Sequence, residues 1–278
     1  PSKGQRSIAG GIVRGPEVLK KADDNWHTEM GAWFPGERVV FRGKDLFTEL
    51  GELSWFKYLM FGITGKNFSD RRISLIEKIW TLTVSYPEPR LWNNRIASLT
   101  GSARSTGALG VSAGIAVSEA SIYGNQINII AIDFIRRANS LKNAEQNLEE
   151  FVKKEIKKNR IIPGYGRPLI KTDERIKPLM DTAKKLNLAE GPHYLTALAV
   201  EKILIESKYR MVMNASGLAA ALMADLGFNN RDHYYCSILA FSAGIIPCYI
   251  DSVGQKEGSF FPLNCERLSY NGVKKRHW

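Results

Sequence analysis

A short stretch near the middle of the chain, residues 163–168, has the composition of a ligand-binding loop: Pro-Gly-Tyr-Gly-Arg-Pro. Two glycines and two prolines in six residues exclude a regular helix, so we expect a tight, exposed loop here. A basic run, residues 153–160, precedes the loop, and Lys171 and Arg175 follow it. Backbone N–H groups beside glycine, surrounded by fixed cations, form a site for an anion. The sequence therefore predicts anion binding at this loop.

The segments around the loop carry apolar residues at helical spacing. Residues 144–158 are amphipathic, with Leu148, Phe151, Val152 and Ile156 on one face. Similar patterns predict further helices at residues 71–85, 97–123 (interrupted by Gly101 and Gly107), 126–137, 174–185, 193–207, 212–226 and 233–246. We therefore predict an all-α protein.

Few segments depart from this helical pattern. Residues 37–43 are expected to form a short strand that ends in a turn, and residues 44–60 to form two short helices around Gly51. Glycine and proline breakers indicate an irregular stretch over residues 1–30. Pro247 is expected to kink or end the last helix, ahead of a loop-like tail.

Composition and charge limit the possible partners. The 278 residues can bury a substantial core as one domain or two. The 39 basic and 28 acidic residues leave a net charge of +11, which favours anionic partners. Basic residues are spread over many segments without a known nucleic-acid-binding signature, so a polyphosphate cofactor such as coenzyme A (CoA) ranks above nucleic acid. A surface that is merely basic and solvated is the remaining alternative.

Cysteine usage and hydropathy indicate the cellular compartment in which the protein is expected. The three cysteines, Cys236, Cys248 and Cys265, are odd in number and lack metal-ligand spacing, which favours a reducing, cytoplasmic location and no bound metal. The longest uncharged apolar runs, such as Cys236–Ile250, are shorter than the ~20 residues of a membrane span. The polar N-terminus shows no signal peptide. We expect no membrane contact.

The order of residues in the loop resembles the Pro-Gly-(Phe/Tyr)-Gly-His … Asp-Pro-Arg signature of the citrate synthase and citryl-CoA lyase family. Other segments resemble the family in the same order: Arg38–Leu46, Leu53–Gly62, Thr196–Ile203, Asn214–Gly217 and Phe241–Ile246. The likeness covers about residues 37–272, and the short length resembles the citryl-CoA lyase module of ATP-citrate lyase.

The resemblance implies a citrate synthase-like, all-α architecture. A large helical domain would comprise residues 1–159 and 231–278, and a smaller one residues 160–230, around a cleft at Pro163–Arg175. Members of the family are dimers, and the Gly/Ala-rich segment Ala97–Ser118 offers a surface for such contact. The chain is accordingly expected to form a homodimer or to be a subunit of a larger lyase or synthase complex.

The resemblance also implies ligands and the residues that bind them. CoA or an acyl-CoA is the implied ligand, together with a small carboxylate. Arg175 stands where the family has a carboxylate-binding arginine, and Arg167 offers a second guanidinium. The residues implied in binding CoA are Pro163, Gly164, Tyr165, Gly166 and Lys171.

The catalytic positions of the family are substituted in this chain. Arg167 stands in place of the loop histidine, Ser216 in place of the catalytic aspartate, and Tyr123 in place of another histidine. A further substrate histidine falls near Glu88, and a late-helix arginine becomes Phe241. The four histidines, His27, His193, His233 and His277, occupy none of these positions, and His193 and His233 are expected to be structural.

Three functions are compatible with this pattern. The first is an altered acyltransferase or lyase that makes or breaks a C–C bond beside an acyl thioester. Ordinary citrate synthesis is not expected, because Ser216 cannot serve as the base that removes a proton. The second is a non-catalytic relative, a pseudoenzyme that binds acyl-CoA or a carboxylate or supports a partner subunit. The third, ranked last, is a basic helical protein that binds nucleic acid.

Overall fold

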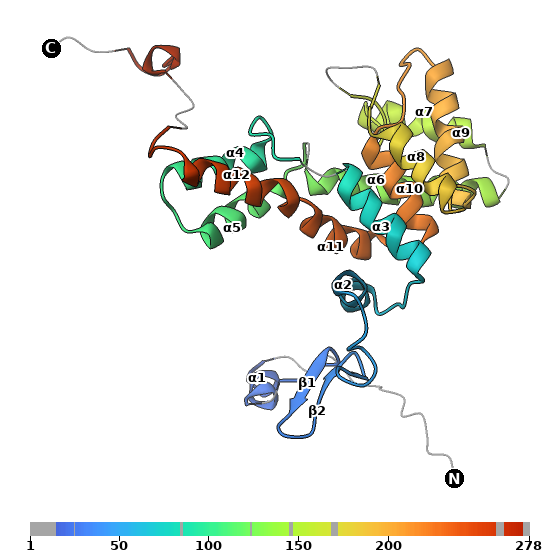
Figure 1. Ribbon diagram of the computed structural model, residues 1–278. Helices are drawn as coiled ribbons and strands as arrows, with labels where there is room; N and C mark the ends of the chain where they lie inside the picture. Colours follow the sequence, from blue (N-terminus) through green and yellow to red (C-terminus); the bar gives the residue numbers. More distant parts are fainter. Residues whose placement is uncertain are drawn as a thin grey trace. The chain divides into compact units, whose positions relative to one another are not determined.

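The computed structural model describes residues 15–24, 26–83, 86–122, 124–144, 147–167, 172–259 and 264–274, without the side chains of Lys142, Asn143 and Cys265. The described part is mainly helical, which confirms the all-α class (Figure 1). Two compact units divide the chain, Pro1–Ser54 and Trp55–Trp278. The sequence did not indicate this boundary. The expected division into domains at residues 159/160 and 230/231 remains a prediction.

The first unit contains a small antiparallel sheet. Its strands are β1 (Gly31–Phe34), β2 (Arg38–Phe41) and β3 (Lys44–Asp45), in the order β1-β2-β3. Strand β2 confirms the strand expected at residues 37–43. Arg42 (φ 48°) and Gly43 (φ 78°) both have left-handed backbones, as a two-residue hairpin turn between β2 and β3 requires.

Two expectations for the first unit were wrong. A short helix, α1 (Pro16–Ala22), lies in the stretch expected to be irregular, and Pro16 opens it in the position that suits proline. No helix forms between Lys44 and Ser54, because the Asp45 carboxylate accepts hydrogen bonds from the N–H groups of Phe47 and Thr48 and makes a turn instead.

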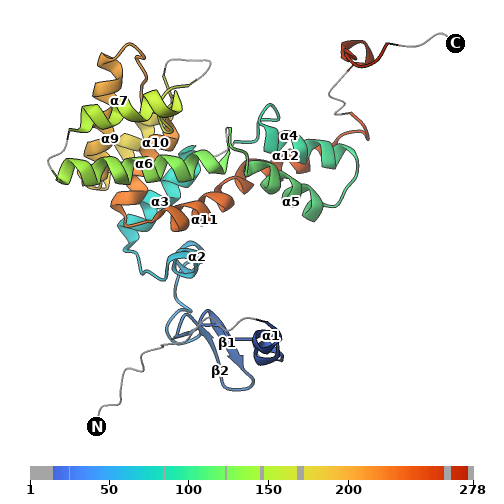
Figure 2. The ribbon, with the colours of Figure 1, turned by 180° about the vertical axis from the view of Figure 1, so that it is seen from behind.

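Most of the second unit is a helical bundle around one buried helix (Figure 2). Its helices are α2 (Trp55–Thr64), α3 (Asp70–Thr83), α6 (Asn125–Asn143), α7 (Leu148–Asn159), α8 (Ile176–Lys185), α9 (Pro192–Glu206), α10 (Ala215–Asp225) and α11 (Asn230–Ala240). Helix α10 is buried over nearly its whole length and packs on α3, α6 and α9. A helix that is apolar on all sides belongs in a core. Its first turn carries Ser216.

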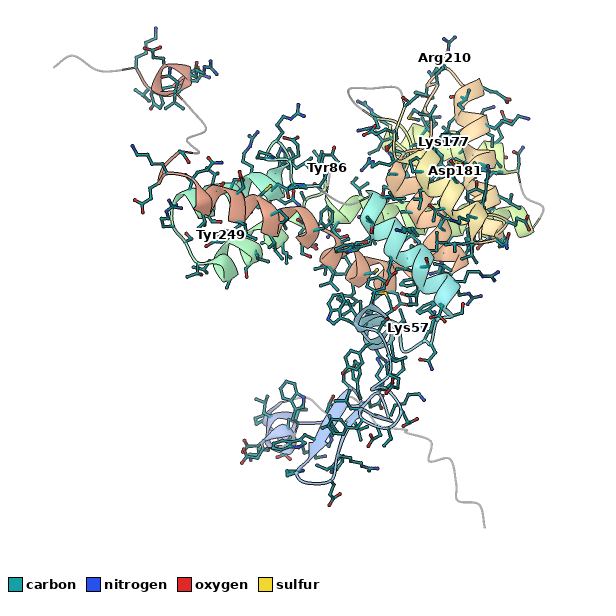
Figure 3. All side chains as sticks on the ribbon, viewed as in Figure 1. Lys57, Tyr86, Lys177, Asp181, Arg210 and Tyr249 are labelled. Atoms are coloured by element: carbon teal, nitrogen blue, oxygen red, sulfur yellow. The ribbon has the colours of Figure 1, made fainter. Side chains whose placement is uncertain are left out.

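A second cluster contains α4 (Trp92–Ser102), α5 (Gly107–Ser118) and α12 (Ser242–Gly254), around Ala97, Ile245 and Cys248. A Cβ added at Gly114 would lie 2.9 Å from the Ile245 side chain, so glycine allows the helices to approach closely. Tyr249 lies on α12 (Figure 3). Its hydroxyl donates a hydrogen bond to the Ser105 carbonyl at 2.7 Å. The expected interruption lies between α4 and α5, whereas Gly101 continues α4.

Helices α11 and α12 follow one another with little interruption at Phe241, and α12 continues past Pro247 to Gly254. The expectation that Pro247 ends the helix was wrong. By length and composition, the 25 residues Asn230–Gly254 could cross a membrane, because an 18-residue window within them has a mean hydropathy of 1.6, but core helices of soluble proteins meet the same criterion. Asp232 and His233 are buried within it. The absence of membrane contact remains a prediction.

Candidate functional site

The glycine-rich loop packs against the chain just before α10. Gly164 (φ 92°) and Gly166 (φ 80°) have left-handed backbones that other residues rarely adopt. The Gly166 N–H donates to the Val212 carbonyl at 2.7 Å, and the Asn214 N–H donates to the Gly164 carbonyl at 2.9 Å. Tyr165 is buried, and its hydroxyl donates to the Ala197 carbonyl at 2.9 Å. The loop is therefore tight, as expected, but buried or half-buried where we expected exposure.

Asn214 joins this loop to α10. Its side-chain oxygen accepts hydrogen bonds from the N–H groups of Ser216 (3.0 Å) and Gly217 (3.2 Å), which caps the helix. Its side-chain nitrogen donates to the Gly166 carbonyl at 2.9 Å. A Cβ at Gly217 would collide with the Gly164 carbonyl oxygen, so the two backbones touch. We call residues 163–167, 173–175 and 214–217 the loop–α10 junction.

Arg175, the expected carboxylate ligand, holds a carboxylate of the chain itself. Its Nε and Nη2 atoms each donate to one oxygen of Asp173, both at 2.8 Å, and Nη1 donates to the Thr83 carbonyl at 3.0 Å. The Ala215 N–H also donates to Asp173 at 2.8 Å, and the Asp173 side chain has no exposed surface. Burial opposes ionisation, but the hydrogen bonds from Arg175 and Ala215 outweigh it and lower the pKa of Asp173 to about 2. Asp173 is therefore ionised and structural.

Arg167 also reaches the Asp173 carboxylate. Its Nη1 atom donates to Glu174 Oε2 at 2.7 Å and lies 3.5 Å from Asp173 Oδ1. The sequence predicted that two guanidiniums would share one site, and the geometry brings both to Asp173. It assigned no role to Asp173 or Glu174. Two acidic residues directly before Arg175 were the available signal.

Ser216 is hydrogen-bonded to an amide. Its hydroxyl donates to Asn128 Oδ1 on α6 at 2.7 Å. The Asn128 side-chain nitrogen in turn lies 3.5 Å from Asn125 Oδ1, and the Asn125 nitrogen lies 3.3 Å from Glu119 Oε1. An amide oxygen accepts a hydrogen bond but is not a base, so this contact does not activate the hydroxyl. Asn128 is a site residue that the sequence alone did not reveal.

The remaining positions lie outside this junction. Tyr123, Pro168 and Lys171 lie outside the described residues. Phe241 packs in the cluster of α4, α5 and α12, and Glu88 pairs with Arg90 at 2.9 Å. Within the described ranges, no three histidine, cysteine, aspartate or glutamate side chains gather as metal ligands.

The two central histidines have structural surroundings. His193 Nδ1 lies 2.8 Å from Asp225 Oδ1. The Asp225 carboxylate also accepts hydrogen bonds from the backbone N–H groups of His193 and Tyr194, in the first turn of α9. His233 is buried, and neither ring nitrogen has a hydrogen-bond partner among the described residues. Burial lowers the pKa of His233 to about 4, so this ring is neutral at physiological pH.

Comparison with solved structures finds the same arrangement of helices elsewhere. Citryl-CoA lyase from Hydrogenobacter thermophilus superimposes with a TM-score of 0.79 at 24% identity, over 91% of this chain and 97% of that chain. A mutant ATP citrate lyase from Methanosaeta concilii, in complex with (3S)-citryl-CoA, matches 99% of this chain and 47% of its own, with a TM-score of 0.72 at 18% identity.

More distant structures share the arrangement. Citrate synthase from Thermoplasma acidophilum, in a ternary complex with carboxymethyl coenzyme A and oxaloacetate, matches 81% of this chain and 58% of its own, with a TM-score of 0.59 at 17% identity. No protein-family model matches the sequence, and a search of curated proteins finds no match. The structural agreement, which extends over nearly the whole chain for the two lyases, shows that this chain has the citrate synthase-like fold.

Proposed function

We propose that the loop–α10 junction binds an acyl-CoA and a small carboxylate, and that a C–C bond beside the acyl thioester is made or broken there. The observation that carries this proposal is the pair of guanidiniums, Arg167 and Arg175, held beside the first turn of α10. Guanidiniums stabilise carboxylates and oxyanions. The fold of the chain is shared with structures that hold CoA derivatives, which supports the same class of ligand.

The two arginines have different roles in this proposal. Arg175 is held by both oxygens of a fully buried carboxylate and by the Thr83 carbonyl, so it positions Asp173 and α10. Arg167 is paired with Glu174, whose side chain is 62% exposed. Exposed ion pairs contribute little stability, so a ligand carboxylate displaces Glu174 at little cost. Arg167 is therefore the arginine that binds the ligand.

The chemistry proposed here does not begin with removal of a proton. Ser216 donates to Asn128 and has no base beside it in the described hydrogen bonds, and a carboxylate with a pKa of about 2 is a weak base. Loss of CO₂ from a malonyl-type thioester leaves its bonding electron pair in an enolate without a base. Arg167 stabilises the enolate oxygen, and the enolate carbon attacks the carbonyl carbon of the acceptor. The C=O π electrons move to the acceptor oxygen, and the resulting alkoxide takes up a proton from water. The sequence also permits lyase chemistry, in which a C–C bond breaks in the reverse sense.

A second candidate function is ligand binding without turnover. The pairing of Ser216 with an amide, and of both arginines with the chain's own carboxylates, favours it. Such a protein would hold acyl-CoA or a carboxylate, or support an active partner subunit. A cytoplasmic location and the absence of a metal remain predictions for either candidate.

We also propose that a second copy of the chain, or a partner subunit, contacts the α4–α5–α12 cluster. Leu109 on α5 and Ile250 on α12 are each 63% exposed, and Ile246 is 44% exposed. Large exposed apolar side chains on packed helices are typical of subunit interfaces. Light scattering at micromolar concentration should give the mass of a dimer, and a monomer would contradict this assignment.

The test of function combines two substrate mixtures. The protein is incubated with acetyl-CoA and oxaloacetate, and separately with malonyl-CoA and candidate acceptors, while free CoA and CO₂ are measured. Turnover of malonyl-CoA that is lost in Arg167→Ala but kept in Arg71→Ala, an exposed arginine on α3, would support the enzyme. Turnover of acetyl-CoA with oxaloacetate that survives both Arg167→Ala and Ser216→Ala would place the active site elsewhere.

Calorimetry separates the remaining candidates. Tight acyl-CoA binding that is weakened in Arg167→Ala, without turnover of either mixture, would favour the non-catalytic protein. Stabilisation by a short oligonucleotide but not by any CoA ester would favour nucleic-acid binding and overturn both acyl-CoA proposals.

A further inference from the structure

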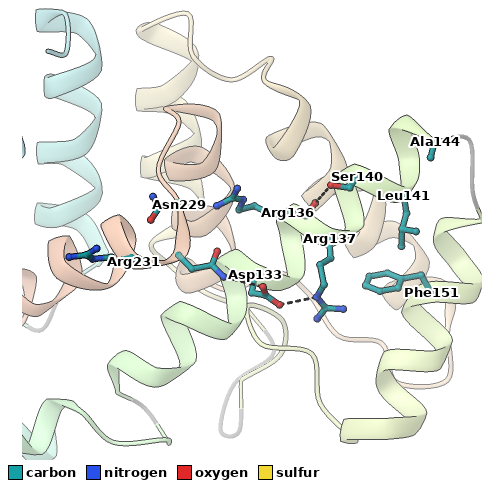
Figure 4. A pocket seen from close by; sticks show the side chains of 10 residues that line it. Asp133, Arg136, Arg137, Ser140, Leu141, Ala144, Phe151, Asn229 and Arg231 are labelled. Carbon is teal, nitrogen blue, oxygen red and sulfur yellow. Dashed lines mark hydrogen bonds and ion pairs between the residues drawn. The ribbon is translucent and has the colours of Figure 1, made fainter. Parts of the chain in front are cut away.

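A separate pocket of about 870 Å³ lies between the C-terminal half of α6, the start of α7 and the start of α11 (Figure 4). Arg136 and Arg137 on α6 and Arg231 on α11 line it, with Asp133 as its acidic residue. We call this site the arginine pocket. None of the residues of the loop–α10 junction lines it.

Only one of the three arginines is fully paired. Arg137 donates to Asp133 Oδ2 at 2.8 Å and to Glu155 Oε1 at 3.1 Å. Asp133 also accepts a hydrogen bond from the Asn230 side chain at 3.0 Å, so its two oxygens are both engaged. In the described part of the chain, the Arg136 guanidinium has no hydrogen bond or ion pair, and that of Arg231 contacts only the Tyr235 ring, 5.5 Å from its centroid. Arg136 and Arg231 therefore have no ion pair among the described residues, although Arg136 lies close enough to Asp133 for its charge to stabilise that carboxylate.

The start of α11 adds backbone donors to these charges. The Asn229 side chain caps the helix by accepting the Asp232 N–H at 2.8 Å. The N–H groups of Asn230 and Arg231, in the first turn of this 11-residue helix, have no intrahelical acceptor. A helix N-terminus carries a partial positive charge and favours phosphate. Arg136 and the N–H groups at the start of α11 thus line one side of the pocket. The Arg231 guanidinium lies over the Tyr235 ring, one turn further along α11, and must rotate away from that ring to meet a phosphate at the start of the helix.

The other wall of the pocket is apolar. Leu141, Ala144 and Phe151 form it, and the Arg137 guanidinium lies over the Phe151 ring, 5.3 Å from its centroid. The volume is within the range of pockets that hold small organic ligands. This combination suits a molecule with an anionic head and an apolar or planar part.

The arginine pocket is distant from the loop–α10 junction. Arg136 follows Asn128 by eight residues on α6, which corresponds to about 12 Å along the helix axis. Ser216 begins α10, whereas Asn229–Arg231 follow the opposite end of that helix. One small carboxylate at the junction therefore does not reach the pocket.

We propose that the arginine pocket binds a phosphorylated small molecule, with its phosphate between Arg136, Arg231 and the start of α11 and its apolar part against Phe151 and Leu141. This ligand is distinct from the small carboxylate of the proposed function, which binds about 12 Å away along α6.

Calorimetry with pyrophosphate, ADP and citrate at low and at physiological salt tests the assignment. ADP is expected to bind more tightly than pyrophosphate because its planar base adds contact with the apolar wall, and citrate is expected to bind most weakly. Replacing both arginines, in Arg136→Gln/Arg231→Gln, should reduce the affinity for ADP by at least about tenfold, because each charge-assisted hydrogen bond contributes on the order of a factor of ten to affinity. The matched control is Arg71→Gln/Arg72→Gln, which removes the same charge from the exposed face of α3.

The proposal would be overturned if no probe binds or if citrate binds best. It would also be overturned if the affinity for ADP is unchanged in Arg136→Gln/Arg231→Gln, or if the pocket variant and the control variant reduce it equally. Circular dichroism establishes that the variants are folded. Light scattering tests the remaining alternative, a subunit contact at this surface. That alternative would hold if the wild type does not bind ADP and the Arg136→Gln/Arg231→Gln variant differs from it in mass. Arg167→Ala should leave ADP affinity unchanged, which separates this test from that of the junction.

Discussion

The loop–α10 junction and the arginine pocket use the same side chain in opposite ways. At the junction, both guanidiniums are compensated by carboxylates of the chain, one of them fully buried. In the arginine pocket, one guanidinium is compensated and two are not. A compensated, buried cation holds the backbone in place, whereas an uncompensated cation at the surface is available to a ligand. The paired arginines of the junction therefore contribute mainly to stability, with Arg167 as the exception because its partner Glu174 is exposed.

The largest expected effect comes from removing the shared carboxylate of the junction. Asp173→Ala leaves Arg175 without its partner and the Ala215 N–H without an acceptor, which should lower the free energy of unfolding by about 3 kcal/mol. Urea denaturation measures the change. A loss below about 1 kcal/mol would mean that this ion pair contributes no more to stability than an exposed ion pair does.

A somewhat smaller effect is expected from acid. The pKa of Asp173 is about 2 in the folded protein, below its ordinary value of 3.8, so its stabilisation is complete above about pH 5 and is lost as pH falls to 2. The loss should be about 2 kcal/mol. Asp173→Ala should remove this part of the pH dependence, as measured by urea denaturation between pH 5 and 2. An unchanged slope in this variant would contradict the assignment.

His233 should lower the stability of the protein over a different pH range from Asp173. Its pKa is about 4 in the folded protein against an ordinary 6.5, so the unfolded chain binds the proton first as pH falls. Stability should fall by about 3 kcal/mol between pH 6.5 and 4 because of this group, and level off below pH 4. The fall should persist in Asp173→Ala and be absent in His233→Phe. The two variants therefore distinguish the pH dependence caused by the buried, neutral His233 ring from that caused by the ion pairs of the junction.

Glu174→Gln is expected to change stability by less than about 1 kcal/mol, because the Glu174 side chain is exposed. The same substitution frees Arg167, so malonyl-CoA should bind a few-fold more tightly by calorimetry. Weaker binding in this variant would show that Glu174 belongs to the ligand site and is not displaced from it.

The smallest effect on stability is expected in the arginine pocket. Arg136→Gln and Arg231→Gln should each change the free energy of unfolding by no more than about 0.5 kcal/mol, because both side chains are exposed and neither forms an ion pair with the described residues. A loss above about 1 kcal/mol in thermal or urea unfolding would remove the contrast between the two regions.

Most helices and the position of the loop follow from local patterns in the sequence. The apolar face of α7 and the uninterrupted apolar residues of α10 are local patterns, and Gly164 and Gly166 occupy positions with positive φ. Such signals depend on neighbours a few residues away, so they can be read along the chain. Arg167 and Arg175 both reach Asp173, which also accepts a hydrogen bond from Ala215, the neighbour of Ser216. The roles of these residues in binding or catalysis remain predictions.

Only the tertiary structure decided what these side chains contact. Ser216 meets Asn128, 88 residues earlier in the chain, and Asn230 meets Asp133, 97 residues earlier. Nothing in the local pattern of either residue specifies such a partner, because the contact depends on how α6 packs against α10 and α11. The exposure of the loop, an end of the helix at Pro247 and the first of the two helices expected around Gly51 were wrong for the same kind of reason. The second of those two helices is confirmed by α2. Where the expectations were wrong, long-range packing and side-chain hydrogen bonds outweighed local propensity.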